Sequence, residues 1–183
     1  MELRPITRES KDKAALQAIN EEAIPEQERC SMDELFDTGA DGNLEILGVY
    51  VSNEPVGFLA VRKFKRVRYM AYFAVRADLR SQGIGSAAIR ELLRQHPESQ
   101  TIVEYESPDF DDADRDRRLR RKRFYLRNGF YETGWNTCYD GMEFEIGCSD
   151  PVFREEEFAE FVAYLKTFIT DHLPNPYPKR KER

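Results

Sequence analysis

Hydrophobic residues recur along the first part of the chain with two different spacings. Residues 3–6 are expected to form a short first strand. Over residues 10–23 the apolar positions return with the period of an amphipathic helix, at Ala15, Leu16, Ile19 and Ala23. The spacing of Ser31 and Glu34 is that of a capping box, which predicts that a second helix follows. The chain is therefore expected to begin with one strand and two helices.

The middle of the chain alternates between strand-like and helix-like segments. Two strand-like runs, 45–51 and 56–63, flank a polar turn, and this arrangement predicts an antiparallel hairpin. A third strand over 68–75 leads through a polar loop into a helix, and a strand over 101–106 follows. A strand–helix–strand crossover of this kind usually joins parallel strands. We therefore expect a parallel strand pair at the centre of the sheet.

The remaining periodic segments predict one more helix and one more hairpin. Residues 112–128 fit a helix, and the runs 130–139 and 142–146 fit two strands joined by an Asp-Gly turn. In the second of these runs apolar residues alternate with Glu143 and Glu145, as in a strand with one buried face. The sequence of elements predicts an α/β fold with a mixed sheet.

Composition and charge narrow the class of protein. The chain has 183 residues, 40% of them hydrophobic, and a net charge of −6. It contains neither a bilayer-spanning apolar run nor an apolar segment typical of a secretory signal at its start. Three scattered cysteines, without CxxC spacing, favour reduced thiols over a disulfide scaffold or a metal site. We expect a cytoplasmic protein that binds no metal, no nucleic acid and no membrane.

The last part of the chain reads as an extension of the main domain. We expect one domain over 1–148 and an extension over 149–183. Residues 151–169 place apolar side chains on one helical face, namely Phe158, Phe161, Val162, Leu165, Phe168 and Ile169. The polar face of this helix is acidic, which favours packing on the sheet or a homodimer contact over a membrane anchor. The basic tail 175–183 has a composition typical of disorder.

The segment RSQGIGS, residues 80–86, carries the most chemical information. Its glycines, Gly83 and Gly85, open a predicted helix and let the backbone approach a ligand closely. The unpaired N–H groups of the first helical turn and the helix dipole favour an anion at this place. Arg80 adds a positive charge with a planar donor group suited to phosphate oxygens. The segment therefore predicts a site for a diphosphate.

A dinucleotide-binding loop is an alternative interpretation of the same residues. Residues 83–88 fit the pattern G-x-G-x-x-A, and Glu104 follows about 20 residues later, where such folds keep a ribose-binding acid. In those folds the strand ends almost at the first glycine, whereas residues 76–82 intervene here. The chain also offers too few further strand–helix units. We rank this alternative well below the first interpretation.

Two motifs together resemble those of the GNAT acetyltransferases. The stretch YFAVRADLRSQGIGSAAI resembles the family's strand followed by Q/R-x-x-G-x-G/A at the head of a helix, with Arg80, Gly83 and Gly85 at the defining positions. Further along, RRKRFYLRNGFYETG resembles the second family motif, an aromatic-tyrosine pair followed by Gly-Phe. The order of the predicted elements also fits this family. The resemblance implies a mostly antiparallel sheet with a splayed central pair of parallel strands, flanked by helices.

The resemblance also implies where acetyl-CoA, the co-substrate, would bind. It would lie in a wedge between the strands 68–75 and 101–106. Its pantetheine arm would pair with the backbone of Phe73, Ala74 and Val75, and a backbone N–H near Val75 would stabilise the oxyanion. The diphosphate would lie on Arg80, Ser81, Gln82, Gly83, Ile84, Gly85 and Ser86.

The reaction of a thioester with an amine needs a base. An alkylamine with a pKa of about 10.4 is only about one part in a thousand neutral near pH 7.4, so its proton must be removed. Strand alternation places Glu104 and Glu106 on one face near the carboxyl end of their strand. We take Glu104 as the candidate base, and solvated glutamates at a strand end are the alternative. Glu22 is a second-line candidate.

Tyr125 is the candidate for stabilising the leaving thiolate. The resemblance implies that the tyrosine of FYLRNGF donates a hydrogen bond or a proton to the CoA sulfur. Full transfer from a phenol to a thiolate is uphill by about 2 kcal/mol from their ordinary pKa values. Either hydrogen bonding or a lowered phenol pKa would account for the role, and plain core packing is the alternative.

Two charged segments add less information. Residues 115–123 hold seven basic residues on a predicted helix beside several aspartates, which favours local ion pairs over a nucleic-acid stripe. The acidic segment 21–29 lies where GNAT relatives form part of the acceptor pocket, and a solvated loop is an equal alternative.

The sequence leaves three functions to compare. The first is an N-acetyltransferase that acts on a primary amine of a small molecule through direct attack in a ternary complex. The second is a CoA-binding sensor without catalysis. The third is a dinucleotide-dependent oxidoreductase. The identity of the acceptor stays open among polyamines, arylalkylamines, aminoglycosides, amino acids and protein N-termini.

Overall fold

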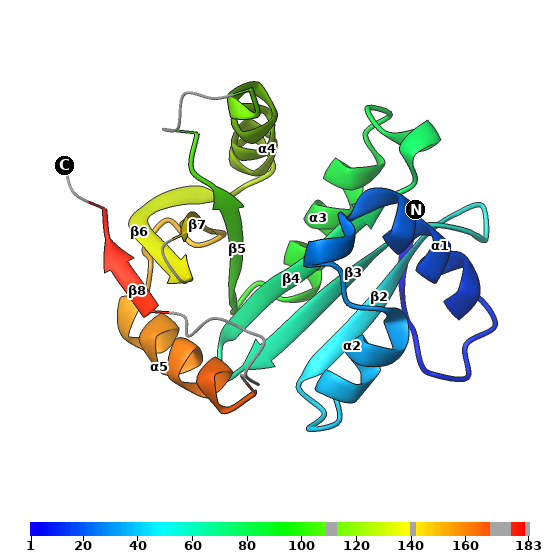
Figure 1. Cartoon of the computed structure of the whole chain (residues 1–183), viewed down its shortest axis with the longest axis horizontal. Helices are drawn as coiled ribbons and strands as arrows, with labels where there is room; N and C mark the ends of the chain where they lie inside the picture. The colour runs from blue at the N-terminus through cyan, green and yellow to red at the C-terminus, as the bar shows by residue number, and fades with distance from the viewer. Residues whose placement is uncertain (109–112, 140–141, 169–176, 182–183) are drawn as a thin grey trace. The chain divides into compact units, whose positions relative to one another are not determined.

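The computed structural model describes residues 1–108, 113–139, 142–168 and 177–181 (Figure 1). It divides into two compact units. The first contains residues 1–63 and 69–97, and the second contains residues 64–68 and 98–183. Each unit combines strands with helices, and together the described residues hold eight strands and five α-helices. This arrangement confirms the predicted α/β class.

The first unit is built on four neighbouring strands in the order β1-β2-β3-β4. Their bounds are β1 Glu2–Pro5, β2 Leu44–Val51, β3 Glu54–Phe64 and β4 Val67–Val75. β1 pairs with β2, and β2 with β3, in antiparallel fashion, so the predicted hairpin is confirmed. Ser52 and Asn53 make its tight turn with positive φ angles of 51° and 65°.

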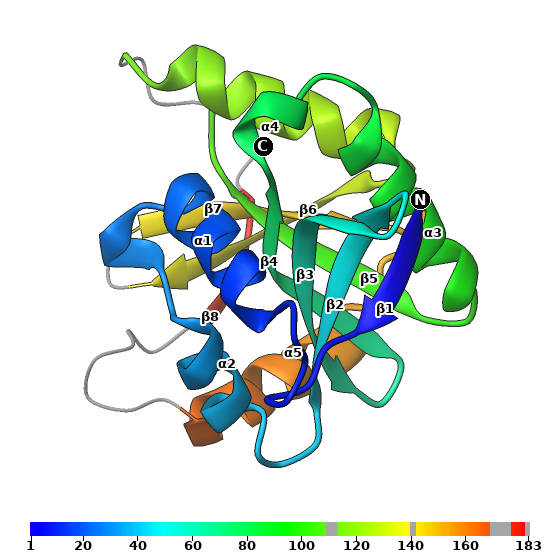
Figure 2. The ribbon, with the colours of Figure 1, turned by 90° about the vertical axis from the view of Figure 1, so that its right-hand side faces the viewer.

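Helices cover both faces of these strands, as Figures 1 and 2 show. α1 (Lys13–Ala23), the short η1 (Glu26–Glu28) and α2 (Met32–Thr38) lie on one face, and α3 (Ile84–Gln95) lies on the other. The core under α1 and α2 is built from Ile6, Leu16, Ile19, Met32, Leu35, Ile46, Tyr50, Phe58, Ala60 and Ala74. The predicted capping box is confirmed, because Ser31 and Glu34 cap each other's backbone at the start of α2.

The strands of the second unit follow the order β5-β7-β6-β8. Their bounds are β5 Gln100–Glu106, β6 Tyr131–Tyr139, β7 Met142–Cys148 and β8 Tyr177–Arg180. β7 pairs with β5 and β6, and β6 pairs with β8, all in antiparallel fashion. The predicted turn at residues 140–141 lies outside the described residues.

Two helices belong to this unit. α4 (Arg115–Arg127) contacts the face of the strands that carries Tyr105 and Glu145, as its ring contacts and ion pairs show. α5 (Glu155–Leu165), followed by the short η3 (Lys166–Phe168), buries Phe158, Phe161 and Val162, as predicted. Residues 168 and 169 belong to the same predicted face, but their side chains are not among those that the structure describes.

Two expectations for this unit are wrong. Disorder was expected over the tail 175–183, yet residues 177–180 form β8, because backbone pairing with β6 and two lysine–glutamate ion pairs compensate for the polar composition. The alternation in β7 predicted a solvated glutamate face, yet Glu145 is only 4% exposed. Lys122 and Lys181 bind its carboxylate at 2.7 and 2.8 Å, which permits its burial.

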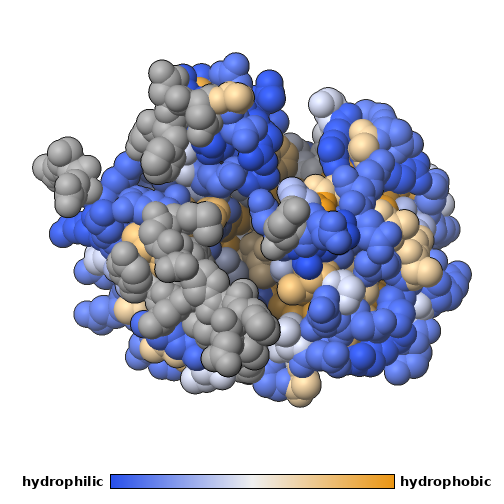
Figure 3. All heavy atoms as spheres, viewed as in Figure 1, coloured by the Kyte–Doolittle hydropathy of each residue, from blue (hydrophilic) through white to orange (hydrophobic). Residues whose placement is uncertain are grey.

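Hydrophilic residues cover most of the described surface on the face shown in Figure 3. No helix within the described ranges is long and apolar enough to cross a bilayer. The three cysteines, Cys30, Cys138 and Cys148, are free thiols.

Candidate functional site

The segment between β4 and α3 forms a structured loop in the first unit. β4 ends at Val75, a 3₁₀ turn, η2 (Ala77–Leu79), follows, and α3 begins at Ile84. The Arg80 Nε–H donates to the Val75 carbonyl at 3.1 Å, so this bond uses neither terminal NH₂ group of the guanidinium. The Gln82 side chain donates to the Asp78 carbonyl at 3.0 Å. These two bonds fold the loop back on the end of the strand.

Gly83 allows the loop to turn into the helix. Its φ of +83° is left-handed, and it occupies the N-cap position of α3. Ser81 also has a positive φ, of 63°. A Cβ added to Gly83 would meet no heavy atom within 4 Å, so the glycine is needed for its backbone angle while the space beside it is open. The loop therefore presents bare backbone to its surroundings.

The first turn of α3 has the properties of an anion site. A helix leaves its first N–H groups without intrahelical partners, and Gly83 has no side chain that could cap them. No acidic residue lies in this turn, and Ile84, Gly85 and Ser86 are partly exposed. The helix dipole and the guanidinium of the exposed Arg80 both favour negative charge here. The residues present thus fit a diphosphate.

The strand that leads into this loop is packed closely on β3. The Arg76 N–H donates to the Val56 carbonyl at 2.9 Å. A side chain at Gly57 would collide with the Ala74 carbonyl oxygen, so this glycine permits the close approach of the two backbones. Ala74 is buried, and Phe73 and Val75 are half-buried.

Glu22, the second-line base candidate, has a structural partner in the same unit. Its carboxylate accepts a hydrogen bond from the Ala77 N–H at 3.0 Å, which ties the end of α1 to the start of the loop. Arg76 bridges Glu54 at 2.5 Å and Asp78 at 2.7 Å. The sequence analysis did not identify Arg76. Its position one residue after the end of the predicted strand could have indicated a role at this junction.

Hydrogen bonds attach the acidic segment 21–29 to its surroundings, while its four glutamates are exposed. Arg29 donates to the carbonyls of Glu21 at 3.1 Å and Ile24 at 3.3 Å, so it caps the last turn of α1. The Tyr72 hydroxyl donates to the Glu28 carbonyl at 3.1 Å, and this bond joins the segment to β4. Burial raises the pKa of Tyr72, so its phenol stays protonated.

Tyr125 lies on α4 of the second unit among three aromatic rings. Its ring centroid is 5.8 Å from that of Tyr105, 5.4 Å from that of Phe124 and 5.6 Å from that of Phe130. Burial raises the pKa of Tyr125, and nearby Arg121 offsets only part of this effect. A lowered phenol pKa was one of the two expected modes of action, and the structure contradicts it. A protonated phenol that donates a hydrogen bond is the mode that fits.

Glu104 and Glu106 lie on one face of β5, as strand alternation predicted. Their Cα partners on β7 are Ile146 and Phe144, and both glutamates are half-buried. The Glu106 carboxylate lies 3.4 Å from Arg117 and 3.4 Å from Arg121 of α4, so two guanidinium groups already neutralise it. These contacts make Glu106 a poor candidate for a base.

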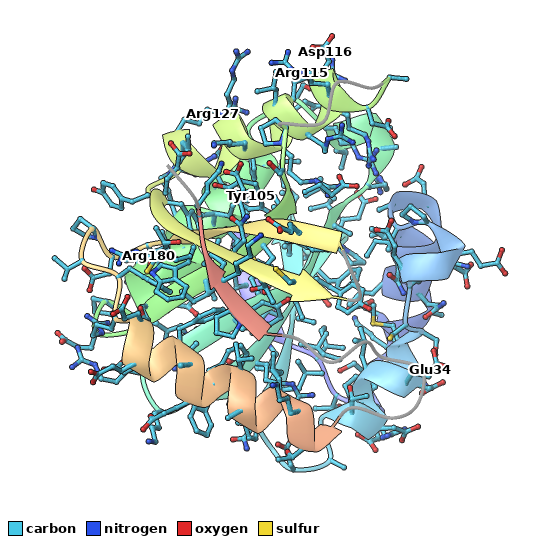
Figure 4. All side chains as sticks on the ribbon, turned by 60° about the vertical axis from the view of Figure 1, so that its left-hand side comes forward. Glu34, Tyr105, Arg115, Asp116, Arg127 and Arg180 are labelled. Carbon is cyan, nitrogen blue, oxygen red and sulfur yellow. The ribbon has the colours of Figure 1, made fainter. Side chains whose placement is uncertain are left out.

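The basic residues of α4 form local ion pairs, as expected. Arg117 also binds Asp114, and Lys122 bridges Glu132 and Glu145. Figure 4 shows Arg115, Asp116 and Arg127 projecting from α4 toward solvent. Within the described part of the chain, no group of His, Cys, Asp and Glu residues could hold a metal ion.

The candidates thus form two groups. The first unit contains the proposed co-substrate contacts 73–75 and 80–86 together with Glu22, and the second contains Tyr125 and Glu104. Sequence reasoning missed Tyr105, which stacks on Tyr125. A large aromatic residue at a buried, alternating strand position was the signal that could have identified it.

Comparisons with known proteins agree on one family. The model of the acetyltransferase (GNAT) family matches residues 13–130. A GNAT-family protein from Bacteroides thetaiotaomicron is similar to this chain, with a TM-score of 0.73 and 20% identity over 91% of this chain and 97% of that one. A search of curated proteins found no matching sequence.

Two further solved structures share the fold. A GNAT acetyltransferase from Elizabethkingia anophelis, solved with acetyl-CoA bound, has a TM-score of 0.55 and 13% identity over 81% of this chain and 97% of that one. The ribosomal-protein-S18-alanine N-acetyltransferase of Escherichia coli has a TM-score of 0.57 and 16% identity over 80% of this chain and 92% of that one. At these identities the similarity shows the fold alone.

Proposed function

The chain belongs to the GNAT family of acetyltransferases, and from this premise we propose that it transfers the acetyl group of acetyl-CoA to a primary amine of a small molecule. The amine nitrogen attacks the thioester carbonyl carbon in a ternary complex. A C–N bond forms, the C–S bond breaks, and the sulfur leaves with CoA. The amine loses one proton and the sulfur gains one, so the products are an acetamide and the free thiol.

The observation that carries this proposal is the bare first turn of α3. Gly83 supplies an open left-handed backbone, and Arg80 supplies a cation beside unpaired N–H groups. We propose that residues 80–86 bind the CoA diphosphate. The backbone of residues 73–75 would pair with the pantetheine arm, as the family resemblance implies. The dinucleotide alternative is less consistent with the loop, because η2 separates the end of β4 from Gly83.

Tyr125 is the proposed donor to the leaving sulfur. Its raised pKa keeps the phenol protonated, and its hydroxyl makes no hydrogen bond to any described residue. A phenol in this state can stabilise developing charge on sulfur by donating a hydrogen bond. Its ordinary pKa already makes complete proton transfer to a thiolate unfavourable, and burial adds to that cost.

Glu104 is the proposed base for the amine. Its half-buried position near the carboxyl end of β5 supports this choice. The acid segment 21–29 is the proposed acceptor-facing surface, and its glutamates suit a cationic amine. The Escherichia coli neighbour acts on an alanine of a ribosomal protein, so protein N-termini belong in any acceptor screen.

Two experiments test the proposed reaction. Calorimetric titration with acetyl-CoA should show saturable binding, and a free-thiol release screen over small amines and N-terminal peptides should identify the acceptor. Binding without thiol release across the panel would favour the CoA-binding sensor. Preferential binding of NAD would favour the oxidoreductase. Release with peptides alone would move the acceptor from small molecules to proteins.

Tyr125→Phe tests the leaving-group step. The substitution removes only the hydroxyl, so acetyl-CoA affinity should stay the same while kcat falls by about 100-fold, a typical effect of losing one donor to developing charge. Steady-state kinetics and calorimetry measure the two quantities. Tyr131→Phe, at an exposed position of β6, serves as the matched control. Unchanged kcat in Tyr125→Phe would remove this residue from the mechanism.

We propose that the extension 149–183 packs on the transferase domain 1–148 and takes no part in the chemistry. A homodimer contact through its helix remains the alternative, and sedimentation analysis of the full chain would decide between them.

A further inference from the structure

Tyr105 of β5 is a buried tyrosine whose hydroxyl performs no evident structural task. Its side chain is 1% exposed, and the hydroxyl has no hydrogen-bond partner among the described residues. Its backbone is the direct neighbour of Glu145 on β7. Figure 4 shows Tyr105 in the interior of the unit, between α4 and the strands. A buried hydroxyl without a partner costs free energy, so the hydroxyl does not stabilise the fold. The role of Tyr105 must therefore be sought in its aromatic ring.

The ring of Tyr105 makes a parallel contact with the ring of Tyr125. The two ring planes differ by only 20° at a centroid distance of 5.8 Å. Phe124 and Phe130 instead meet Tyr125 edge-on, at 65° and 71°. Edge contacts limit how far the Tyr125 ring can shift sideways, whereas the stacked face sets the plane in which it lies. Tyr105 is thus the one ring of these three that supports Tyr125 from its face.

The surroundings of Tyr105 hold this stack in place. A Cβ at Gly147 would come within 3.2 Å of the Tyr105 ring, so the glycine leaves the room that the ring occupies. Lys122, three residues before Tyr125 on the same face of α4, binds Glu145 of β7 at 2.7 Å. The helix is therefore attached to the strands by an ion pair and by the ring stack, one turn apart.

We propose that Tyr105 is a positioning residue for Tyr125. Its ring fixes the plane of the Tyr125 phenol, and thereby the direction in which the hydroxyl donates to the sulfur. This inference rests on the proposed role of Tyr125. A catalytic donor must be held within a fraction of an ångström, and a small misplacement costs a large factor in rate.

Three variants separate this role from general stability. Tyr105→Leu removes the flat face, and we expect kcat to fall by about tenfold or more while the KM for acetyl-CoA stays within about twofold. Tyr105→Phe keeps the face and removes only the unpartnered hydroxyl, so it should retain most of the kcat that Tyr105→Leu loses. Phe158→Leu, a buried aromatic of α5, is the matched control and should lose stability without a change in kcat.

The decisive measurement combines Tyr105→Leu with Tyr125→Phe. If Tyr105 acts through the phenol of Tyr125, the double variant should be no slower than Tyr125→Phe alone. Multiplying effects in the double variant, or an equal loss of kcat in Phe158→Leu, would overturn the inference. Tyr105→Met, which fills the site without a flat face, replaces Tyr105→Leu if the latter does not fold.

The outcomes also separate this inference from the proposed function. A wild-type protein that releases no thiol with any amine contradicts the proposed function itself. Unchanged turnover in Tyr125→Phe, with an active wild type, removes both the role of Tyr125 and that of Tyr105 and leaves acetyl transfer intact. Loss in Tyr125→Phe without loss in Tyr105→Leu overturns only the positioning role.

Discussion

At the scale of single residues, Gly83 combines a left-handed backbone with an open flank. A position can require glycine because its φ is left-handed, or because a Cβ would collide with a neighbouring atom. At Gly83 only the first reason applies. The surface beside it is therefore available to a ligand, and a side chain added there would cover it.

The substitution Gly83→Ala tests this combination. Forcing an L-residue into the left-handed region should lower the free energy of unfolding by about 1 kcal/mol. The new methyl group would also obstruct the proposed diphosphate surface, so the Kd for acetyl-CoA should rise by about tenfold or more. Chemical denaturation and calorimetry measure the two effects.

Gly42→Ala provides the matched control. Gly42 has a φ of +76° and likewise nothing within 4 Å of an added Cβ, but it lies in the loop before β2. It should lose as much stability as Gly83→Ala and bind acetyl-CoA like the wild type. Equal affinities in the two variants would contradict a ligand role for the loop.

The residue scale also shows what the sequence could not reveal. The sequence RSQGIGS suffices to predict a helix start with exposed backbone, because that feature is local. The stacking of Tyr105 on Tyr125 depends on a contact between two segments that are distant in sequence. No spacing rule within one segment contains that information.

At the scale of elements, β7 shows how a charged residue comes to be buried. Strand alternation predicted the positions of its polar residues correctly but not their exposure. Lys122 comes from α4 and Lys181 follows β8, so the two cations that neutralise Glu145 are distant in sequence. Ser107 adds a hydrogen bond at 3.1 Å. Pattern reasoning on β7 alone had no access to these partners.

Glu145→Gln should reveal this arrangement through stability. The substitution removes the charge that faces Lys122 and Lys181. Lys122 keeps Glu132 as a partner, so we expect a loss of about 2 kcal/mol in the free energy of unfolding. Glu143→Gln, whose side chain is 33% exposed and pairs with Lys179, is the control and should cost about 1 kcal/mol or less. Similar losses in both variants would contradict the burial argument.

The same residue predicts a dependence of stability on pH. Burial acts to raise the pKa of Glu145, but hydrogen bonds and charges from Lys122 and Lys181 outweigh it, so the pKa is lowered on folding. Such a carboxyl adds stability that is fully present above its unfolded pKa of about 4.3 and is lost as the pH falls through the folded value. In urea titrations below about pH 4.3, Glu145→Gln should therefore lose less stability with falling pH than the wild type. Parallel acid curves would refute this assignment.

At the scale of the whole molecule, ligand binding should raise the stability of the first unit. A ligand that binds only the native state at 100 times its Kd adds about 2.7 kcal/mol. For a chain of this size, acetyl-CoA should therefore raise the melting temperature by roughly 5 to 10 °C, and NAD at the same concentration should not. Scanning calorimetry of the full chain measures both. A larger shift with NAD would revive the dinucleotide alternative.

The order of elements was the part of the whole fold that the sequence predicted well. Periodicity located most of the strands and helices within a few residues, because most of them have a one-sided apolar pattern. The division of the candidates between two units, with the loop 80–86 in one and Tyr125 in the other, follows from long-range contacts. The strand β8 escaped prediction because its pairing partner, not its own composition, gives it order.

That last strand has a consequence for biosynthesis. Residues 177–180 leave the ribosome well after residues 131–139, so the outer side of β6 has no neighbour in the growing polypeptide. During that interval Glu145 also lacks the cation from Lys181. The second unit therefore completes its sheet only after residues 177–181 have left the ribosome. Until then the free edge of β6 is a place where a chaperone or another strand would bind.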